Sequence, residues 1–260
     1  MNYETLVITK KDDVTTVALN RPEVHNAMNE TLMNELTDCF HHLSTDDSIT
    51  AIILTGNGKS FCAGADLTWM KKMVNYSVEE NKKDSRLLLE MYESIHSCPK
   101  PVFGRINGAA FGGGIGLFAI CDITVTIPEV LFAFSEVKLG IIPAVISTFV
   151  ASRMTPATMR RLFITGERFD SLTAQKIGLI DLVVPLERLD ETMFSCVEQI
   201  RSSGPTAIKE VKHLIYHLEK MNIKAYKEFT VEKISELRVS PEGQEGIKGF
   251  LEKRKPSWKR

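Results

Sequence analysis

The sequence predicts an α/β fold followed by a helical C-terminal part. Up to about residue 155, short apolar runs typical of strands alternate with stretches of helical periodicity, an alternation that indicates α/β architecture. Beyond that point strand patterns become rare, and Pro205 opens a helical pattern with one apolar face, formed by Ile208, Val211, Ile215 and Leu218. The 260 residues suffice for one domain with a helical appendage.

The first elements are predicted to form a hairpin and then a β-α-β step. Residues 6–9 and 14–19 are two apolar runs separated by a polar turn, which favours two short paired strands. Apolar residues at helical spacing predict an amphipathic helix over about residues 29–44. The isoleucine-rich run 51–54 is typical of a buried parallel strand.

A second step follows in the same order. Ser77 with Glu80 three residues later is a capping-box pattern and predicts a helix that ends near residue 97. Pro101 breaks that helix, and residues 101–106 are predicted as the next strand. A glycine-rich turn at 107–114 leads to an apolar helix at 115–121 and a β-branched strand at 123–127.

Composition limits the function classes. Lys and Arg total 32 against 33 Asp and Glu, so overall charge argues against nucleic acid or an anionic membrane as partner. The five cysteines are widely spaced without a CxxC pair, which favours reduced thiols over a metal or redox site. Residues 1–11 lack a signal or transit pattern, and no stretch approaches the roughly 20 apolar residues of a membrane span. We therefore expect a protein of the bacterial cytoplasm or, alternatively, a processed mature form.

Two glycine-rich loops, residues 61–66 and 107–114, each follow a predicted strand. Small residues let a ligand approach the main chain, and three glycines opening a helix leave N–H groups pointing outward, which suits a phosphate or a developing oxyanion. A tight turn packed against a helix explains the same residues equally well. Neither loop carries the GxGxxG dinucleotide pattern or a Walker motif.

Several ordered motifs resemble the crotonase, or enoyl-CoA hydratase/isomerase, superfamily over essentially the whole chain. The motifs are residues 19–22 with Asn26 and Ala27, residues 61–67, Asn107 and Gly108 with residues 111–114, residues 121–123, and Ser135 and Glu136 with residues 139–143. The resemblance implies a ClpP/crotonase-like spiral of repeated β-β-α units in residues 1–200. It also implies a C-terminal helical oligomerisation region in residues 201–260 that builds homotrimers or dimers of trimers.

The resemblance implies where a substrate would bind. In the superfamily the thioester carbonyl lies between two main-chain N–H groups, which fall on Ala65 and Gly113. Charge gathers on that carbonyl oxygen as an enolate forms, and losing one such donor typically costs about 2.7–4 kcal/mol. Contacts with the acyl-CoA substrate are expected from the surrounding loop residues, Ala63, Gly64, Asp66, Leu67 and Gly112.

The resemblance implies one acid/base residue instead of two. Hydratases of the superfamily usually hold a water between two glutamates, and the second of these falls on Glu136 whereas the first falls on Gly116. Glycine has no acid/base group, so a mechanism with two carboxylates cannot operate in this form. Superfamily isomerases shuttle a proton with a single carboxylate at the position of Glu136, so a Δ3,Δ2-enoyl-CoA isomerase is the alternative.

Residues 114–117, 132–140 and 142–147 most resemble the methylglutaconyl-CoA hydratase group of bacterial leucine and isoprenoid breakdown. We therefore favour hydration of a 2-enoyl-CoA, with 3-methylglutaconyl-CoA as a candidate substrate. The same stretch lacks the glycine-rich continuation followed by Thr-Gln-Arg-Leu that many relatives carry. The source of the second proton therefore stays unassigned.

Coenzyme A enters as part of the substrate, and the chemistry requires no metal or redox cofactor. The resemblance matches Lys253 to a lysine near the coenzyme A phosphates, often supplied by a neighbouring subunit, and Phe250 to an aromatic residue of the same region. A solvated helix end explains the basic tail equally well. An alternative from a different functional class is a non-catalytic protein that binds a CoA ligand or RNA. The near-zero net charge argues against RNA.

Overall fold

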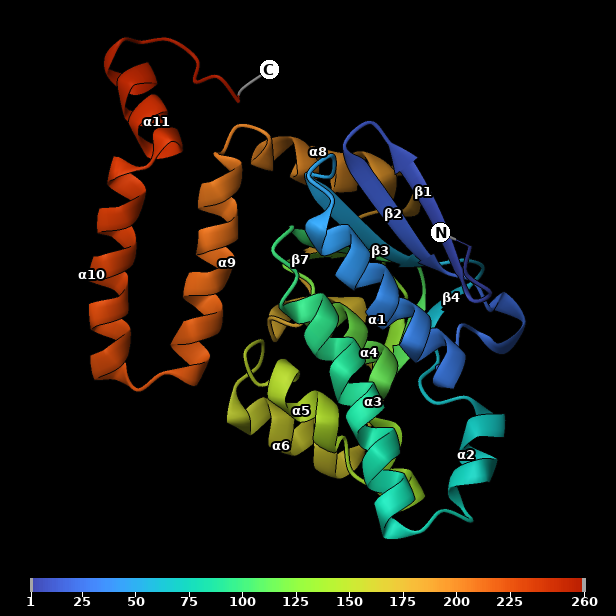
Figure 1. Cartoon of the computed structure of the whole chain (residues 1–260). Coiled ribbons are helices and arrows are strands. Elements are labelled where there is room, and N and C mark those ends of the chain that lie inside the picture. The colour runs from blue at the N-terminus through green and yellow to red at the C-terminus, as the bar shows by residue number, and fades with distance from the viewer. Residues whose placement is uncertain (1, 259–260) are drawn as a thin grey trace.

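The computed structural model describes residues 2–258 and has the α/β core that the sequence predicts. Helices surround two β-sheets, and three C-terminal helices project from this core as an arm (Figure 1). None of the helices in residues 2–258 combines the length and the apolar character that a membrane span requires.

The larger sheet has the order β1-β2-β3-β5-β7-β10. Its strands are β1 (Leu6–Lys11), β2 (Val14–Leu19), β3 (Ala51–Gly56), β5 (Val102–Ile106), β7 (Ile123–Thr126) and β10 (Leu182–Val183). β1 and β2 form the expected antiparallel hairpin, and every other neighbouring pair is parallel. All six residues of β3 are buried, as the isoleucine-rich run predicts for a central parallel strand.

A second, smaller sheet has the order β4-β6-β8-β9. Its strands are β4 (Ser60–Cys62), β6 (Ala109–Phe111), β8 (Leu131–Ala133) and β9 (Phe169–Asp170). The pairs β3/β4, β5/β6 and β7/β8 each give one strand to each sheet, so the main chain follows the spiral of β-β-α units. The prediction of an unbroken glycine-rich turn at residues 107–114 was wrong, because β6 lies inside it and pairs with β4 and β8.

The first helices are the short 3-10 helix η1 (Pro22–Val24), α1 (Glu30–Thr45), α2 (Leu67–Met73), α3 (Val78–His96) and α4 (Gly113–Ala119). Among them, α1, α3 and α4 correspond to predicted helices, whereas η1 and α2 were not predicted. The capping box of Ser77 and Glu80 is present at the start of α3. α4 begins two residues earlier than expected, at Gly113, and Figure 1 shows α1 and α3 running side by side over the core.

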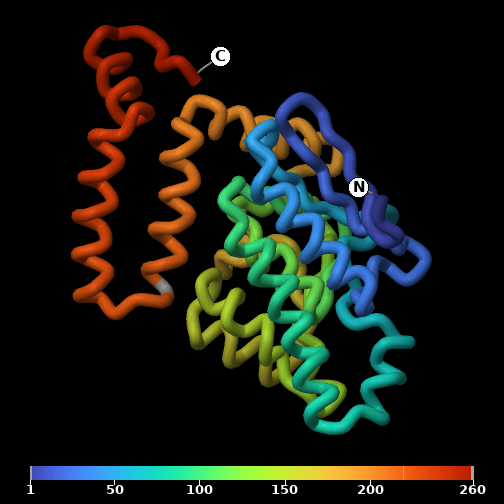
Figure 2. Tube along the Cα trace, viewed as in Figure 1, coloured from blue at the N-terminus to red at the C-terminus, as the bar shows by residue number. Residues whose placement is uncertain are grey.

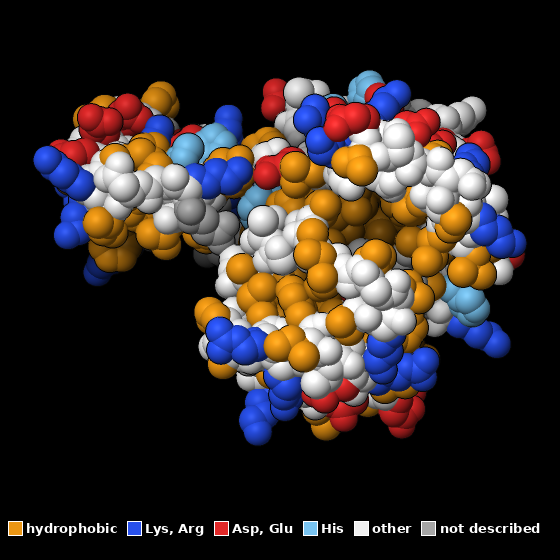
Figure 3. Space-filling model, turned by 90° about the horizontal axis from the view of Figure 1, so that it is seen from below, with side chains coloured by type: hydrophobic (Ala, Val, Ile, Leu, Met, Phe, Trp, Pro, Cys, Tyr) orange, Lys and Arg blue, Asp and Glu red, His pale blue; other side chains and the backbone are white. Residues whose placement is uncertain are grey.

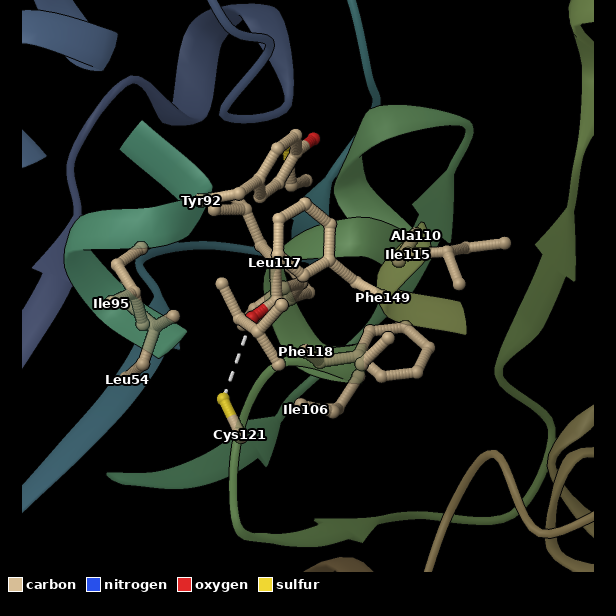
Figure 4. Close-up of a cluster of buried hydrophobic side chains, with 14 of the residues drawn as sticks. Leu54, Tyr92, Ile95, Ile106, Ala110, Ile115, Leu117, Phe118, Cys121 and Phe149 are labelled. Carbon is tan, nitrogen blue, oxygen red and sulfur yellow. Dashed lines mark hydrogen bonds between the residues drawn. The ribbon is translucent and has the colours of Figure 1, made fainter. Parts of the chain in front are cut away.

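An aromatic cluster fills the space around α4. The Phe118 ring meets Phe61 with centroids 6.1 Å apart and Phe132 at 5.4 Å, and Tyr92 meets Phe149 at 5.5 Å. Figure 4 shows Tyr92, Leu117, Phe118 and Phe149 packed together. Truncating a buried phenylalanine to alanine typically costs about 3–5 kcal/mol, so this cluster fixes the position of α4.

Strands become rare after residue 155, as predicted, since β9 and β10 have only two residues each. The remaining core elements are η2 (Ser135–Leu139), α5 (Ala144–Val150), α6 (Pro156–Thr165), α7 (Ser171–Lys176), η3 (Leu186–Arg188) and α8 (Leu189–Ile200). The C-terminal arm consists of α9 (Pro205–Lys220), α10 (Ile223–Val239) and α11 (Pro241–Leu251). In Figure 2 the chain leaves the core after α8, and α9 and α10 lie antiparallel.

Candidate active site

The two glycine-rich loops meet at one place. A Cβ atom added to Gly64 would lie 2.8 Å from the Phe111 oxygen and 3.9 Å from the Gly113 nitrogen. Gly64 also has φ of +89°, a conformation that glycine adopts at little cost. The sequence motifs around residues 61–66 and 107–114 therefore form one continuous surface.

Met28 joins the two loops. Its N–H donates to the Gly64 oxygen at 2.7 Å, and its own oxygen accepts from the Asp66 N–H at 2.8 Å. The Met28 Cε methyl lies only 2.2 Å from the place where a Cβ of Gly113 would stand. A side chain at position 113 would therefore displace Met28 and separate the loops.

The N–H groups of Ala65 and Gly113 have no acceptor among residues 2–258. Met28 and Ala65 form an isolated parallel β-bridge, in which the N–H groups of Met28 and Asp66 are the donors. The Ala65 N–H takes no part in this bridge and is directed away from Met28. Gly113 is the first residue of α4, where main-chain N–H groups lack intrahelical acceptors. Two unpaired donors thus stand on neighbouring loops, an arrangement that suits an oxyanion.

Glu136 brings a carboxylate to these loops from η2. A Cβ added to Gly112 would lie 2.8 Å from Glu136 Oε1, so the carboxylate rests against the turn that precedes Gly113. Its other oxygen, Oε2, is buried and has no hydrogen-bond partner among the described residues. Burial raises the pKa of Glu136, and a hydrogen bond from its own main chain opposes that rise only in part. Such an unpaired, partly desolvated carboxylate is a candidate acid/base.

The space beside Gly116 is already filled. A Cβ at this position would lie 2.6 Å from Ile146 Cγ2 and 3.0 Å from two ring atoms of Tyr92. A glutamate at position 116 would fit only if both side chains moved. Sequence reasoning missed Tyr92, which falls in no quoted motif and arrives from α3. It included Ile146 in the stretch 142–147 but did not predict its contact with position 116, which depends on the packing of α5 on α4.

The Asp66 side chain caps a helix and forms an ion pair. It accepts from the N–H groups of Thr68 at 2.7 Å and Trp69 at 3.2 Å and so caps α2. Arg21 donates to the same carboxylate at 2.8 Å. Burial opposes ionisation of Asp66, but these bonds outweigh burial and lower its pKa. The cap fixes the start of α2, where Leu67 is 74% exposed.

Exposed apolar side chains follow Glu136 along the chain. Leu139, Ile141 and Ile142 are 60%, 55% and 72% exposed. On the face seen in Figure 3, hydrophobic side chains gather in a hollowed region of the core. An acyl chain could bind to such a surface without burying polar groups.

The arm residues Lys253 and Phe250 lie apart from the loops within one chain. Figures 1 and 2 show α11 at the far end of the arm, well separated from α2 and α4. Phe250 is 84% exposed, and the neighbouring Arg254 is engaged with Glu245 at 2.7 Å. These residues could reach a ligand in the loops only if an arm from another chain lay against them.

Two main-chain donors on loops next to one carboxylate are the parts of an enzyme site that stabilises a developing oxyanion while a proton moves. The family described as enoyl-CoA hydratase/isomerase matches residues 9–260. The chain therefore belongs to the enoyl-CoA hydratase/isomerase family.

Full-length relatives agree with this assignment. The short-chain-enoyl-CoA hydratase of Clostridium acetobutylicum is 31% identical over 257 residues, covering 98% of this chain and 97% of that protein. The mitochondrial enoyl-CoA hydratase of Pongo abelii is 31% identical, covering 99% and 89%. The crystal structure of an enoyl-CoA hydratase from Shewanella pealeana superposes with a TM-score of 0.93 at 36% identity, covering 98% and 96%.

Proposed function

We propose that this chain is an enoyl-CoA hydratase that adds water across the double bond of a 2-enoyl-CoA with Glu136 as its acid/base. The observation that carries the proposal is the Glu136 carboxylate, which rests against Gly112 and keeps one buried oxygen unpaired among the described residues. Hydratases related over their full length, at 31% identity, support the reaction type.

In the proposed mechanism the thioester oxygen accepts hydrogen bonds from the N–H groups of Ala65 and Gly113. Glu136 removes a proton from water as the water oxygen bonds to C3 of the acyl chain. The electron pair of the double bond moves toward C1, and the enolate oxygen is stabilised by the two donors. The enolate then takes a proton at C2, and the hydrated thioester forms.

Glu136 also supplies the proton at C2 in this proposal. Gly116 offers no second acid/base group, and Ile146 and Tyr92 fill the space beside it. The carboxyl group that has just accepted the proton of water is then the nearest donor. Both additions therefore occur on the same face of the acyl chain, so hydration in D₂O should give a single, syn-labelled product.

Isomerisation is the second candidate. A single carboxylate can take a proton from C2 of a 3-enoyl-CoA and return it to C4, with the same enolate between the two steps. Gly116 favours this alternative, since the site lacks the second group that would hold a water. Hydration adds one water to the product and isomerisation adds nothing, so product mass separates them.

For the acyl group we propose 3-methylglutaconyl-CoA. The support is the resemblance of residues 132–140 and 142–147 to the hydratase group that uses this thioester. We also propose that residues 201–260 assemble the chain into trimers or dimers of trimers. Support comes from large hydrophobic side chains on the arm that are about half exposed or more, among them Val211, Ile215, Val231 and Val239.

The test is mass spectrometry of products after incubation with 3-methylglutaconyl-CoA, crotonyl-CoA and a 3-enoyl-CoA. The wild-type chain is expected to add one water, and Glu136→Gln is expected to lose activity by a factor on the order of 100 to 10,000. Glu187→Gln, which changes an exposed glutamate of η3, is the matched control and should retain full activity.

Each outcome decides between functions. A water-adduct from 3-methylglutaconyl-CoA alone supports the specific substrate, and one from crotonyl-CoA supports only the general reaction. Conversion of the 3-enoyl-CoA without a change of mass makes the chain an isomerase. No turnover of any of the three thioesters would contradict the proposed function.

A further inference from the structure

The phenol of Tyr92 is a buried polar group beside the proposed site. The side chain is 0% exposed, and its hydroxyl donates to the Gly113 oxygen at 2.7 Å. The ring packs on Phe149 (Figure 4). Two of its atoms lie 3.0 Å from the place where a Cβ of Gly116 would stand. A buried hydroxyl needs a partner, because an unpaired one typically costs about 1–3 kcal/mol. Its partner here belongs to the same glycine whose N–H is one of the two free donors.

Gly113 stands in a segment without side chains, whose conformation depends on main-chain hydrogen bonds such as that from the Gly112 N–H to the Ala133 oxygen at 2.9 Å. Residues 112–114 are three consecutive glycines, and a glycine has more accessible main-chain conformations than any other residue. Gly112 has φ of +49° and turns the chain sharply into α4. The hydrogen bond from Tyr92 to the Gly113 oxygen fixes the peptide plane between Gly113 and Gly114. It therefore restrains rotation about the main-chain bonds of Gly113.

Tyr92 contacts both glycine-rich loops, one directly and the other through Met28. The Tyr92 hydroxyl lies 2.9 Å from the place where a Gly113 Cβ would stand, and 3.9 Å from Met28 Sδ. Met28 in turn binds Gly64 and Asp66 through its main chain. Tyr92 therefore contacts, directly and through Met28, the segments that carry both free N–H groups.

We propose that Tyr92 is a positioning residue whose hydroxyl clamps the Gly113 carbonyl, restrains rotation about the Gly113 Cα and so helps to hold the Gly113 N–H toward the thioester oxygen. This inference rests on the proposed function, because it assumes that a thioester carbonyl binds at the two donors. A donor stabilises a transition state only if its orientation is fixed before the charge develops. The peptide before Gly113 is held by the Ile115 N–H, which donates to the Gly112 oxygen at 2.9 Å. The Tyr92 hydroxyl adds a second restraint on the other side of Gly113, at its carbonyl oxygen.

The test is Tyr92→Phe, which keeps the ring in its packing and removes only the hydroxyl. With crotonyl-CoA we expect kcat to fall about tenfold with KM changed less than about twofold, since a loosened donor acts mainly on the enolate. Ser171→Ala is the matched control. Ser171 is also buried, and its hydroxyl donates to the Ile127 oxygen at 2.7 Å, outside the proposed site. This variant should keep kcat while losing a similar amount of stability.

A second readout does not depend on turnover. The carbonyl stretch of bound ¹³C-labelled crotonyl-CoA is measured by infrared difference spectroscopy in Glu136→Gln and in Glu136→Gln combined with Tyr92→Phe. We expect the band to shift to lower frequency in the first protein and to return part of the way toward the free thioester in the second. Combining Glu136→Gln with Ser171→Ala should leave the band unchanged.

An identical carbonyl band with and without the Tyr92 hydroxyl would overturn the inference, as would an equal loss of kcat in Ser171→Ala. If the wild-type chain fails to hydrate crotonyl-CoA but the band responds to Tyr92→Phe, the hydratase proposal is wrong for this thioester while the clamp stands. Failure of the two proposals is therefore distinguishable.

Discussion

At the scale of single residues, Glu136 makes activity and stability respond to pH in opposite directions. Burial raises the pKa of its carboxyl, and a general base must be ionised, so kcat/KM is expected to fall as pH drops through that raised pKa. The native chain binds the proton more tightly than the unfolded chain. Its stability therefore increases as pH falls from the raised pKa toward the ordinary glutamate value.

Glu136→Gln should then be more stable than the wild type at pH 7, by about 1 kcal/mol, because it removes a largely buried charge, one oxygen of which has no hydrogen-bond partner among the described residues. The difference should vanish near pH 4, where the wild-type carboxyl is protonated. Thermal unfolding midpoints at a fixed protein concentration measure it. A variant that is less stable than the wild type at both pH values would show that the carboxylate is stabilised by its surroundings.

Gly112 is expected to tolerate no side chain. Its φ of +49° strains any other residue, and a Cβ would lie 2.8 Å from Glu136 Oε1. Gly112→Ala should lose about 1–3 kcal/mol of stability and at least about tenfold in kcat, because the carboxylate must move. Gly140→Ala is the control. Gly140 also has a positive φ, +75°, but a Cβ there meets no atom within 4 Å. An equal loss of kcat in the control would attribute the effect to backbone strain alone.

The residues of the site differ in how far sequence could predict them. Gly64, Gly112 and Gly113 belong to local patterns in which a turn must precede a helix, so their places follow from neighbouring residues. Glu136 was predicted through resemblance, since a single glutamate has no pattern of its own. Tyr92 could not be predicted, because it meets Gly113 through the packing of α3 on α4, which no spacing of residues in the chain encodes.

At the scale of elements, the sequence predicted the longer strands of the larger sheet, but neither its two-residue strand β10 nor the strands of the smaller sheet. β1, β2 and β3 have six residues each, enough for alternation or continuous hydrophobicity to appear. β4, β6 and β8 have three residues each, fewer than the four to eight over which such patterns are recognised. These short segments form strands because the tertiary fold places them side by side, where β6 pairs with β4 and β8.

The packing of α4 on α5 predicts a coupled pair of substitutions. Gly116→Ala improves helix propensity by about 0.5–1 kcal/mol, but its Cβ would lie 2.6 Å from Ile146 Cγ2 and 3.0 Å from the Tyr92 ring. Overpacking of this kind typically costs about 1–3 kcal/mol, so the single variant should be destabilised. In an Ile146→Ala background the closest contact is gone and only that with the Tyr92 ring remains, so the same change should cost less. Additive effects across the double-mutant cycle, measured by thermal unfolding, would contradict the steric coupling.

At the scale of the whole molecule, much of the arm does not contact the core. On the described side chains of the arm, Val231, Val239 and Phe250 are 60%, 77% and 84% exposed, and Figure 3 shows the arm extending away from the core. Such exposure is rare in monomers and favours assembly. The helical pattern after Pro205 predicted these helices. It could not predict the projection of the arm, since an apolar face fits a core or another chain equally well.

Assembly through the arm predicts that Lys253 serves a site in a neighbouring subunit. In one chain α11 lies far from the glycine loops (Figure 1), so a contact between Lys253 and the phosphates of coenzyme A would require an arm from another chain. Lys253→Glu is then expected to raise KM for the acyl-CoA about tenfold while leaving kcat unchanged, because it removes ground-state and transition-state binding alike. Lys227→Glu, a charge reversal at an exposed lysine of α10, should leave KM unchanged.

Mixed oligomers separate a contact in the same chain from one between chains. Subunits with Glu136→Gln and subunits with Lys253→Glu are co-expressed with different tags, and the mixed assemblies are purified through both. If Lys253 acts across the interface, some sites combine an intact Glu136 with an intact Lys253 from the neighbour, and activity with the wild-type KM reappears. If Lys253 acts within its own chain, every site that keeps Glu136 lacks the lysine, and the mixture retains the raised KM of Lys253→Glu alone. The wild-type KM in the mixture is the outcome that the separation of α11 from the loops within one chain leads us to expect.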